Sequence, residues 1–165
     1  MPVIATLVVG ADGSTSRDGN SAGVSSDIDR SQFLQRRRSA DCIIIGGNTA
    51  RTEPYHRTPV PVVVISRALI NPLTDNRLAH CWNLSPIKAL DKAVNTFGPR
   101  IHIEAGFSII QKLLEAGRID ELELSITAIT GGEDKINIEE LLANFDSLSE
   151  VSVDGTRMIS AKKLK

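Results

Sequence analysis

Three short stretches of small or polar residues directly follow apolar runs that predict buried strands, and each stretch could bind phosphate. In an open α/β sheet, ligands bind beyond the carboxyl ends of the strands, where helix N-termini present N–H groups to anions. Two phosphate sites on neighbouring strands favour a dinucleotide. A third site, in which a serine stands beside an arginine (Ser66-Arg67), suits the additional phosphate that distinguishes NADP from NAD. The stretches are Gly46-Gly47, Ser66-Arg67 and Gly106.

Hydroxyl groups accompany two of these stretches, because Thr49 follows Gly46-Gly47 and Ser108 follows Gly106. Ordinary turn formation explains each glycine equally well when it is considered alone. The GxGxxG fingerprint of Rossmann dehydrogenases is absent, which disfavours that class. Hydride transfer remains attractive, since the cofactor carries the reactive atoms and the protein mainly positions it.

The run Arg36-Arg37-Arg38 contains one arginine whose spacing differs from that of its neighbours. Arg37 alone follows apolar residues at both the third and the fourth preceding positions, so it shares the apolar face of a predicted helix. A guanidinium that points inward needs an anion. Together with Arg51 and Arg57, Arg37 therefore suggests a phosphorylated substrate. The alternative is a solvated helix end, where basic residues complement the helix dipole.

Glu104 ends an apolar run directly before Gly106 and is the candidate catalytic residue. An ionised carboxylate in such a place must be hydrogen-bonded or paired with a cation. A plain salt bridge to Arg100 or Arg118 is the alternative. Glu53, which precedes a proline, is equally ambiguous.

The three histidines, His56, His80 and His102, lack the spacing of a metal site, so no bound metal is predicted. His102 lies within an apolar run and is expected to be a hydrogen-bonded histidine of a sheet. The chain has no GxSxG elbow and no recognisable catalytic triad, which disfavours covalent hydrolysis.

The composition predicts one globular domain spanning residues 1–165. The 19 Lys and Arg nearly balance the 20 Asp and Glu, so a nucleic-acid partner is not expected. No apolar run approaches the roughly 18–20 residues that span a membrane, and the first residues do not resemble a signal peptide. With two cysteines, the expectation is a cytoplasmic protein with reduced thiols.

The elements that must position these residues alternate between strands and helices. Strands are predicted over 3–9, 43–45, 60–65, 101–103, 121–129, 151–153 and 157–161. Helices are predicted over 27–39, 48–52, 86–96, 107–116 and 139–144. Residues 12–26 form a long polar loop, and residues 68–85 show no regular pattern. The predicted class is a three-layer α-β-α fold, with a mostly parallel central sheet and an antiparallel C-terminal hairpin.

A set of short motifs occurs in a fixed order over residues 3–130. The order resembles the reductase domain of riboflavin biosynthesis, a pyrimidine reductase family that shares the dihydrofolate reductase-like fold. The motifs are Ala11-Asp12-Gly13, Asp18-Gly19-Asn20-Ser21, Asp29-Arg30, Arg37 with Ala40-Asp41, Ile43 through Glu53, Ile103-Glu104-Ala105-Gly106 with Leu113-Leu114, and Gly117 through Leu122.

The resemblance implies an NADPH-dependent reductase that reduces the ribosyl group of 5-amino-6-(5-phosphoribosylamino)uracil to the ribityl product, and it implies a homodimer. It assigns NADPH to a mobile loop at Gly23, to Thr49 and Glu53, and to a segment over the pyrophosphate. That segment comprises Ala105, Gly106, Phe107 and Ser108. The resemblance also implies that the substrate is bound by Ser21, Arg37, Arg57 and Glu104, and that the two arginines bind its 5-phosphate.

Two other interpretations stay open. One is a dihydrofolate reductase or another small-molecule NADPH reductase on the same fold, because Asp27 and Asp29 open the first helix where such enzymes keep an acidic residue. The Pro-Trp pair expected before that helix is missing. The other is a catalytically silent, nucleotide-binding regulatory protein, since residues 68–100 match the reductase pattern poorly.

Overall fold

The computed structural model describes residues 2–68, 70–104 and 106–164. The chain divides into two compact units. The first unit comprises Met1–Ala5 and Arg36–Ile119, and the second comprises Thr6–Gln35 and Asp120–Lys165.

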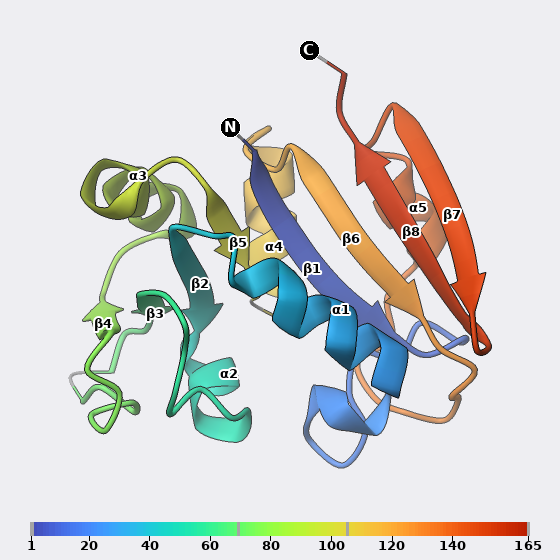
Figure 1. Ribbon diagram of the computed structural model, residues 1–165, viewed down its shortest axis with the longest axis horizontal. Coiled ribbons are helices and arrows are strands. Elements are labelled where there is room, and N and C mark those ends of the chain that lie inside the picture. The colour runs from blue at the N-terminus through green and yellow to red at the C-terminus, as the bar shows by residue number, and fades with distance from the viewer. Residues whose placement is uncertain (1, 69, 105, 165) are drawn as a thin grey trace. The chain divides into compact units, whose positions relative to one another are not determined.

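The strands and helices alternate through most of the described residues (Figure 1). The strands are β1 (Val3–Val9), β2 (Cys42–Gly46), β3 (Val62–Ile65), β4 (Ala79–Trp82), β5 (Ile101–Ile103), β6 (Glu121–Ile126), β7 (Ser147–Val153) and β8 (Thr156–Lys162). The helices are the 3-10 turn η1 (Ser21–Gly23), α1 (Asp27–Arg37), α2 (Gly47–Thr52), α3 (Pro86–Phe97), α4 (Phe107–Glu115) and α5 (Ile138–Leu142). The strands form an eight-stranded sheet in the order β4-β3-β2-β5-β1-β6-β8-β7.

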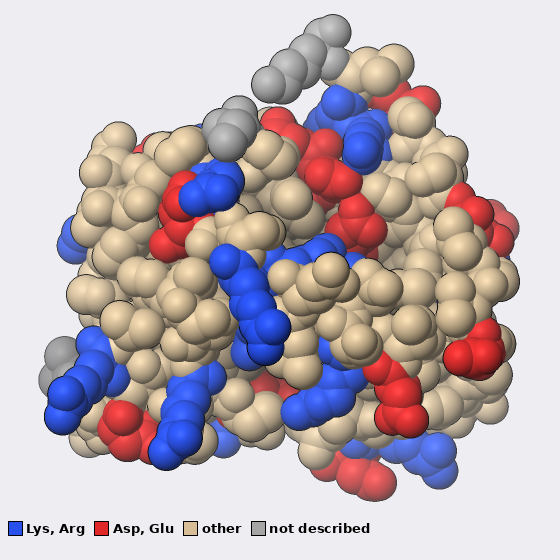
Figure 2. Space-filling view, in the orientation of Figure 1, with Lys and Arg blue, Asp and Glu red and all other residues tan. Residues whose placement is uncertain are grey.

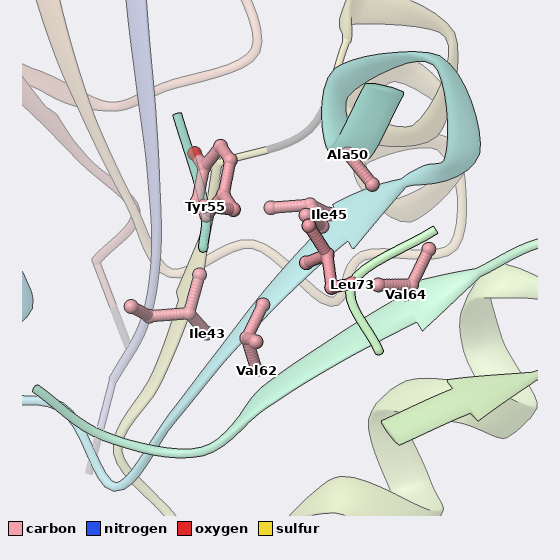
Figure 3. Packing of buried hydrophobic residues seen from close by; sticks show 7 residues of the cluster. All are labelled: Ile43, Ile45, Ala50, Tyr55, Val62, Val64 and Leu73. Carbon is pink, nitrogen blue, oxygen red and sulfur yellow. The ribbon is translucent and has the colours of Figure 1, made fainter. Parts of the chain in front are cut away.

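In the first unit, β4, β3, β2, β5 and the start of β1 run parallel. Parallel strands carry near-continuous β-branched runs because both of their faces are buried, and Val62–Ile65 is such a run. Alternate residues point to opposite faces. One face bears a cluster of buried side chains, which Figure 3 shows: Ile43, Ile45, Ala50, Tyr55, Val62, Val64 and Leu73.

The helix α3 contacts β2, β3 and β5 within this unit. Its start is fixed by Ser85, whose side chain accepts a hydrogen bond from the Lys88 N–H, and by Pro86 at the first helical position. Gly98 ends it with φ of 132°. The helix is therefore delimited by the residues from which its bounds were predicted.

The second unit contains the antiparallel strands β6, β8 and β7. The β7–β8 hairpin turns at Asp154 and Gly155, whose φ angles of 50° and 80° are those of a type I′ turn. The predicted α/β class, mostly parallel with an antiparallel C-terminal pair, is confirmed. That residues 1–165 form one domain remains a prediction.

The start of the long polar loop, residues 12–26, is held within the second unit by hydrogen bonds. The Asp12 carboxylate accepts hydrogen bonds from Ser14 and from the Gly131 N–H, and these contacts hold its pKa well below the usual value. Gly13 has φ of 86°, and a Cβ there would lie 2.3 Å from the Ile136 carbonyl oxygen. Only glycine fits that position without displacing the backbone.

Several predicted bounds were wrong. The segment predicted to be irregular contains β4, an edge strand in parallel register with β3. α1 ends at Arg37, two residues before its predicted end, and β6 ends at Ile126 rather than at residue 129.

Both described cysteines, Cys42 and Cys81, are free thiols. Among the described residues, no helix combines the length and apolar character needed to cross a membrane.

Candidate functional site

Four ionisable side chains meet inside the first unit, and we call them the Glu104 cluster: Arg37, Tyr55, His102 and Glu104. Arg37 is the last residue of α1, and Tyr55 follows α2. His102 lies in β5, and Glu104 comes directly after that strand. All four are buried, with at most 7% of each residue exposed.

Arg37 and Glu104 form the centre of the cluster. The Arg37 Nη2 donates to Glu104 Oε1 at 2.6 Å, and its Nε donates to Oε2 at 3.4 Å. This two-point contact matches the planar guanidinium to the carboxylate. A buried ion pair of this kind orients both partners, since neither can move without leaving the other unpaired.

Tyr55 and His102 complete the surroundings of the carboxylate. The Tyr55 hydroxyl donates to Glu104 Oε1 at 2.7 Å, and the His102 Nδ1 lies 3.1 Å from Oε2. An ionised carboxylate can only accept hydrogen bonds, so the contact with His102 is favourable when Nδ1 carries a hydrogen. Each oxygen of Glu104 therefore faces two nitrogen or hydroxyl groups.

These contacts determine the charge states within the cluster. Burial raises the pKa of Glu104, but His102 and Arg37 outweigh that effect, and its pKa lies below the ordinary value. Burial lowers the pKa of Arg37, and Glu104 more than restores it. Burial and the nearby Glu104 raise the pKa of Tyr55 well above its ordinary value. At neutral pH the cluster thus holds a carboxylate, a guanidinium and a neutral phenol.

The inward orientation predicted for Arg37 is confirmed, and the anion beside it is Glu104. The two alternative partners suggested for Glu104 were wrong. Arg100 instead pairs with Asp41 at 2.6 Å, and Arg118 pairs with Asp91 at 2.7 Å.

Gly106 caps α4 at the carboxyl end of β5. It provides no side-chain hydrogen bond to the helix, and no described residue beyond its chain neighbours and the helix backbone has an atom within 4 Å of the place where a Cβ would stand. Phe107 and Ser108 form the first turn of this helix. An open helix N-terminus of this length suits phosphate. Ala105, also predicted to bind the cofactor, lies outside the described residues.

Gly46 and Gly47 have a packing explanation as well. A Cβ on Gly46 would lie 3.0 Å from Ile109 Cδ1 of α4. A Cβ on Gly47 would lie 3.1 Å from the Ser66 Oγ and 3.2 Å from Arg51 Nη1. Gly47 and Ser66, predicted to serve one ligand, therefore lie side by side, and a Cβ at Gly47 would oblige the Ser66 and Arg51 side chains to shift by a few tenths of an ångström.

The remaining predicted residues are distributed over both units. In the first unit, Thr49 lies in α2 and its carbonyl oxygen accepts from the Glu53 N–H. Arg57 is exposed in the segment after α2. Ser21 and Gly23 form η1 in the second unit. Of the two acidic residues noted for a dihydrofolate reductase, Asp27 is exposed, whereas Asp29 is buried there and accepts from the Ser25 hydroxyl at 2.7 Å.

Sequence reasoning gave Tyr55 no role and treated His102 only as a histidine of the sheet. Their contacts with Glu104 depend on the tertiary fold, and no sequence signal pointed to them.

A cavity of about 210 Å³ lies beside His102, and its lining contains none of the residues predicted to bind cofactor or substrate. The described residues contain no group of three His, Cys, Asp or Glu that could hold a metal ion. Figure 2 shows basic and acidic side chains mixed over one face, in keeping with the balanced composition.

Solved structures with the same fold come from several bacteria. A pyrimidine reductase-like protein of Corynebacterium diphtheriae is 20% identical with a TM-score of 0.70, over 99% of this chain and 92% of that one. A putative riboflavin biosynthesis protein of Shewanella sp. PV-4 is 17% identical with a TM-score of 0.71, over the full length of both chains. At these identities the similarity establishes the fold.

A larger enzyme contains the same fold as one part. It is the diaminohydroxyphosphoribosylaminopyrimidine deaminase/5-amino-6-(5-phosphoribosylamino)uracil reductase of Thermotoga maritima, 12% identical with a TM-score of 0.68. The match covers 99% of this chain and 57% of that protein. A search of curated proteins finds no match. The family model of the RibD C-terminal domain matches residues 2–157. Because that match covers nearly the whole sequence, the chain belongs to the RibD C-terminal domain family.

Proposed function

We propose that this chain is an NADPH-dependent reductase that converts the ribosyl group of 5-amino-6-(5-phosphoribosylamino)uracil to a ribityl group. Membership of the RibD C-terminal domain family supports an oxidoreductase of this kind. The observation that carries the proposal is the position of the Glu104 cluster. Glu104, which pairs with the buried Arg37, stands two residues before Gly106, the residue that caps α4. The chain thus brings a carboxylate bound to an arginine close in sequence to a helix N-terminus suited to phosphate.

The residues at α4 fit a dinucleotide. Gly106 leaves space that no described protein atom fills, and the following N–H groups of Phe107 and Ser108 lie in the first helical turn. These three residues would hold the pyrophosphate, with Thr49, Glu53 and Ser66 on the cofactor side. When bound, NADPH supplies a hydride, and the protein contributes orientation and charge.

Glu104 fits a binding role better than that of a proton donor. Its lowered pKa keeps the carboxylate ionised at neutral pH, so it has no proton of its own to give. Its two oxygens already face Arg37, Tyr55 and His102, so we assign Glu104 the role of holding Arg37 in place. We assign Arg37 and Arg57 to the substrate phosphate, because guanidinium groups bind phosphate in a defined geometry.

The proposal predicts the substrate dependence of NADPH oxidation. The absorbance of NADPH should fall with 5-amino-6-(5-phosphoribosylamino)uracil and should stay constant with dihydrofolate or with no added substrate. Turnover with dihydrofolate alone would favour the dihydrofolate reductase alternative. Binding of NADPH without turnover of either substrate would contradict the proposed reaction and favour the regulatory alternative.

A further inference from the structure

The cavity of about 210 Å³ lies within the first unit, and we call it the Arg36 cavity. Its walls come from the end of α1 with the residues after it, from the start of β1, and from β5 with the residue before it. The apolar wall residues are Pro2, Ile4, Ala40 and Ile101. His102 is the one lining residue that also belongs to the Glu104 cluster. The cavity is thus a separate space from the site proposed for cofactor and substrate.

The two arginines that line the cavity differ in how their charge is balanced. Arg100 pairs with Asp41, because its Nη2 and Nε donate to Asp41 Oδ1 at 2.6 Å and 3.1 Å. Arg36 forms no ion pair with any described residue. No described Asp or Glu lines the cavity. The positive charge of Arg36 is therefore not balanced by a carboxylate in these walls.

One edge of the Arg36 guanidinium lacks hydrogen-bond acceptors. Its Nε and Nη2 are buried, and neither has a hydrogen-bond partner among the described residues. The neighbouring Arg37 shows what this edge can bind, since it uses the same two nitrogens to hold the two oxygens of Glu104. Buried charged donors without acceptors are costly. The free edge of Arg36 therefore suits an anion with two oxygens, and the cavity that Arg36 lines has room for one.

The size and the walls of the cavity limit the kind of anion. A cavity of roughly 150 Å³ is enough to hold a benzene ring. The Arg36 cavity is larger, at about 210 Å³, so it has space for a ring together with a carboxylate. Its apolar walls gain by covering an apolar body, which inorganic phosphate does not have. Size, walls and charge together favour a small carboxylate with an apolar body.

We propose that the Arg36 cavity is a binding site for a small monocarboxylate whose body is a ring or a short chain of about six carbons. The carboxylate oxygens accept hydrogen bonds from Nε and Nη2 of Arg36, and the apolar body packs against Ile4 and Ala40. Ser39 and Arg100, which also line the cavity, are exposed, so the ligand enters from the surface. Neither NADPH nor the reductase substrate takes part in this site, and the inference does not rest on the proposed function.

Isothermal titration calorimetry with benzoate and benzamide tests the carboxylate. Benzamide has the same shape, but an NH₂ group replaces one oxygen and the charge is absent. Benzoate should bind at least about tenfold more tightly, the usual effect of hydrogen bonds to a charged group. Inorganic phosphate should also bind at least about tenfold more weakly than benzoate. Equal affinity for benzoate and either of the other two compounds, or no binding of benzoate at about 10 mM, overturns the proposal.

Arg36→Met tests the assigned guanidinium, because methionine keeps a long side chain and removes the donors. It should weaken benzoate binding at least about tenfold. Arg38→Met is the matched control: it removes the same charge from an exposed residue that does not line the cavity. This control should bind benzoate as the wild-type protein does. Wild-type affinity in Arg36→Met, or equal losses in both variants, would show that benzoate does not depend on the edge of Arg36 and would overturn the site.

A variant that fills the cavity tests its location. Ala40→Leu keeps Arg36 and adds a larger apolar side chain to the wall. Benzoate should raise the Tm of the wild-type protein and of Arg38→Met, since a ligand that binds the folded state stabilises it, and should leave the Tm of Ala40→Leu unchanged. An equal rise of Tm in Ala40→Leu would place the anion outside the cavity and overturn the proposal. None of these measurements uses NADPH or the reductase substrate, so their failure leaves the proposed function untouched.

Discussion

Glu104→Gln is expected to lower the free energy of unfolding at pH 7 by about 3–5 kcal/mol, the usual cost of removing one partner from a buried ion pair. The substitution leaves the guanidinium of Arg37 buried without a counter-charge. Glutamine also replaces one acceptor oxygen by an NH₂ group, which Tyr55 or His102 cannot donate to. Urea unfolding of both proteins at pH 7 measures the difference.

The difference should depend on pH in a defined direction. Because the pKa of Glu104 is lowered in the folded protein, its ionisation stabilises the fold above the ordinary value of 4.5. That contribution disappears as the pH falls below 4.5 and through the lowered folded-state pKa. At low pH the wild-type carboxyl is neutral, as glutamine is, so the gap between the two unfolding free energies should shrink on acidification.

Two further variants show whether the ion pair is the cause. Glu150→Gln breaks an exposed pair with Arg157 and should change stability far less. The double variant Arg37→Met with Glu104→Leu removes both buried charges and should regain much of the stability lost in either single variant. A pH-independent gap, or a double variant whose losses simply add, would contradict the paired charges described here.

Arg37→Lys is expected to weaken binding of the ribityl phosphate product by about 10–100-fold, since lysine keeps the charge and loses the planar fork that binds phosphate at two points. Isothermal titration calorimetry measures the affinity directly. Binding of NADPH should stay within about twofold of wild type, because the pyrophosphate is assigned to α4.

Arg36→Lys provides the matched control, because Arg36 adjoins Arg37 in the chain and lines the separate cavity. It should leave product affinity unchanged. If Arg37→Lys binds the product as tightly as wild type does, Arg37 serves only as the structural partner of Glu104. If both variants lose affinity equally, general positive charge rather than a positioned arginine binds the phosphate.

The arginine that faces inward could be identified from the sequence because helical spacing is a local property. Arg37 follows apolar residues at the third and fourth preceding positions, and the fold buries it. Its partner could not be identified in the same way. Glu104 lies 67 residues further along the chain, and the contact depends on how β5 and the end of α1 come together.

Tyr55 was missed for a similar reason. It stands 49 residues before Glu104, in a short segment with no periodic pattern. β4 was missed because its residues, Ala79–Trp82, include His, Cys and Trp and are not fully buried, so they lack the β-branched run that marks β2 and β3. A parallel edge strand with one neighbour carries a weaker sequence signal than a central strand does.

Gly46 and Gly47 illustrate a different limit. A sequence shows that glycine is present but does not show whether a ligand or the protein itself excludes the Cβ. Here Ile109, Ser66 and Arg51 fill the space, whereas the space at Gly106 stays open. The proposed assignment of the pyrophosphate to α4 comes from the family resemblance, and the open space at Gly106 is compatible with it.

Transfer of isotope from cofactor to product tests the proposed reaction most directly. The protein is incubated with 5-amino-6-(5-phosphoribosylamino)uracil and with NADPH that carries deuterium at the nicotinamide C4. Mass spectrometry and NMR of the product should then show one deuterium, located at C1′ of a ribityl chain. With deuterium at both C4 positions of NADPH, product without deuterium at C1′, or unchanged substrate in the presence of bound NADPH, would contradict the assignment of this chain as the reductase.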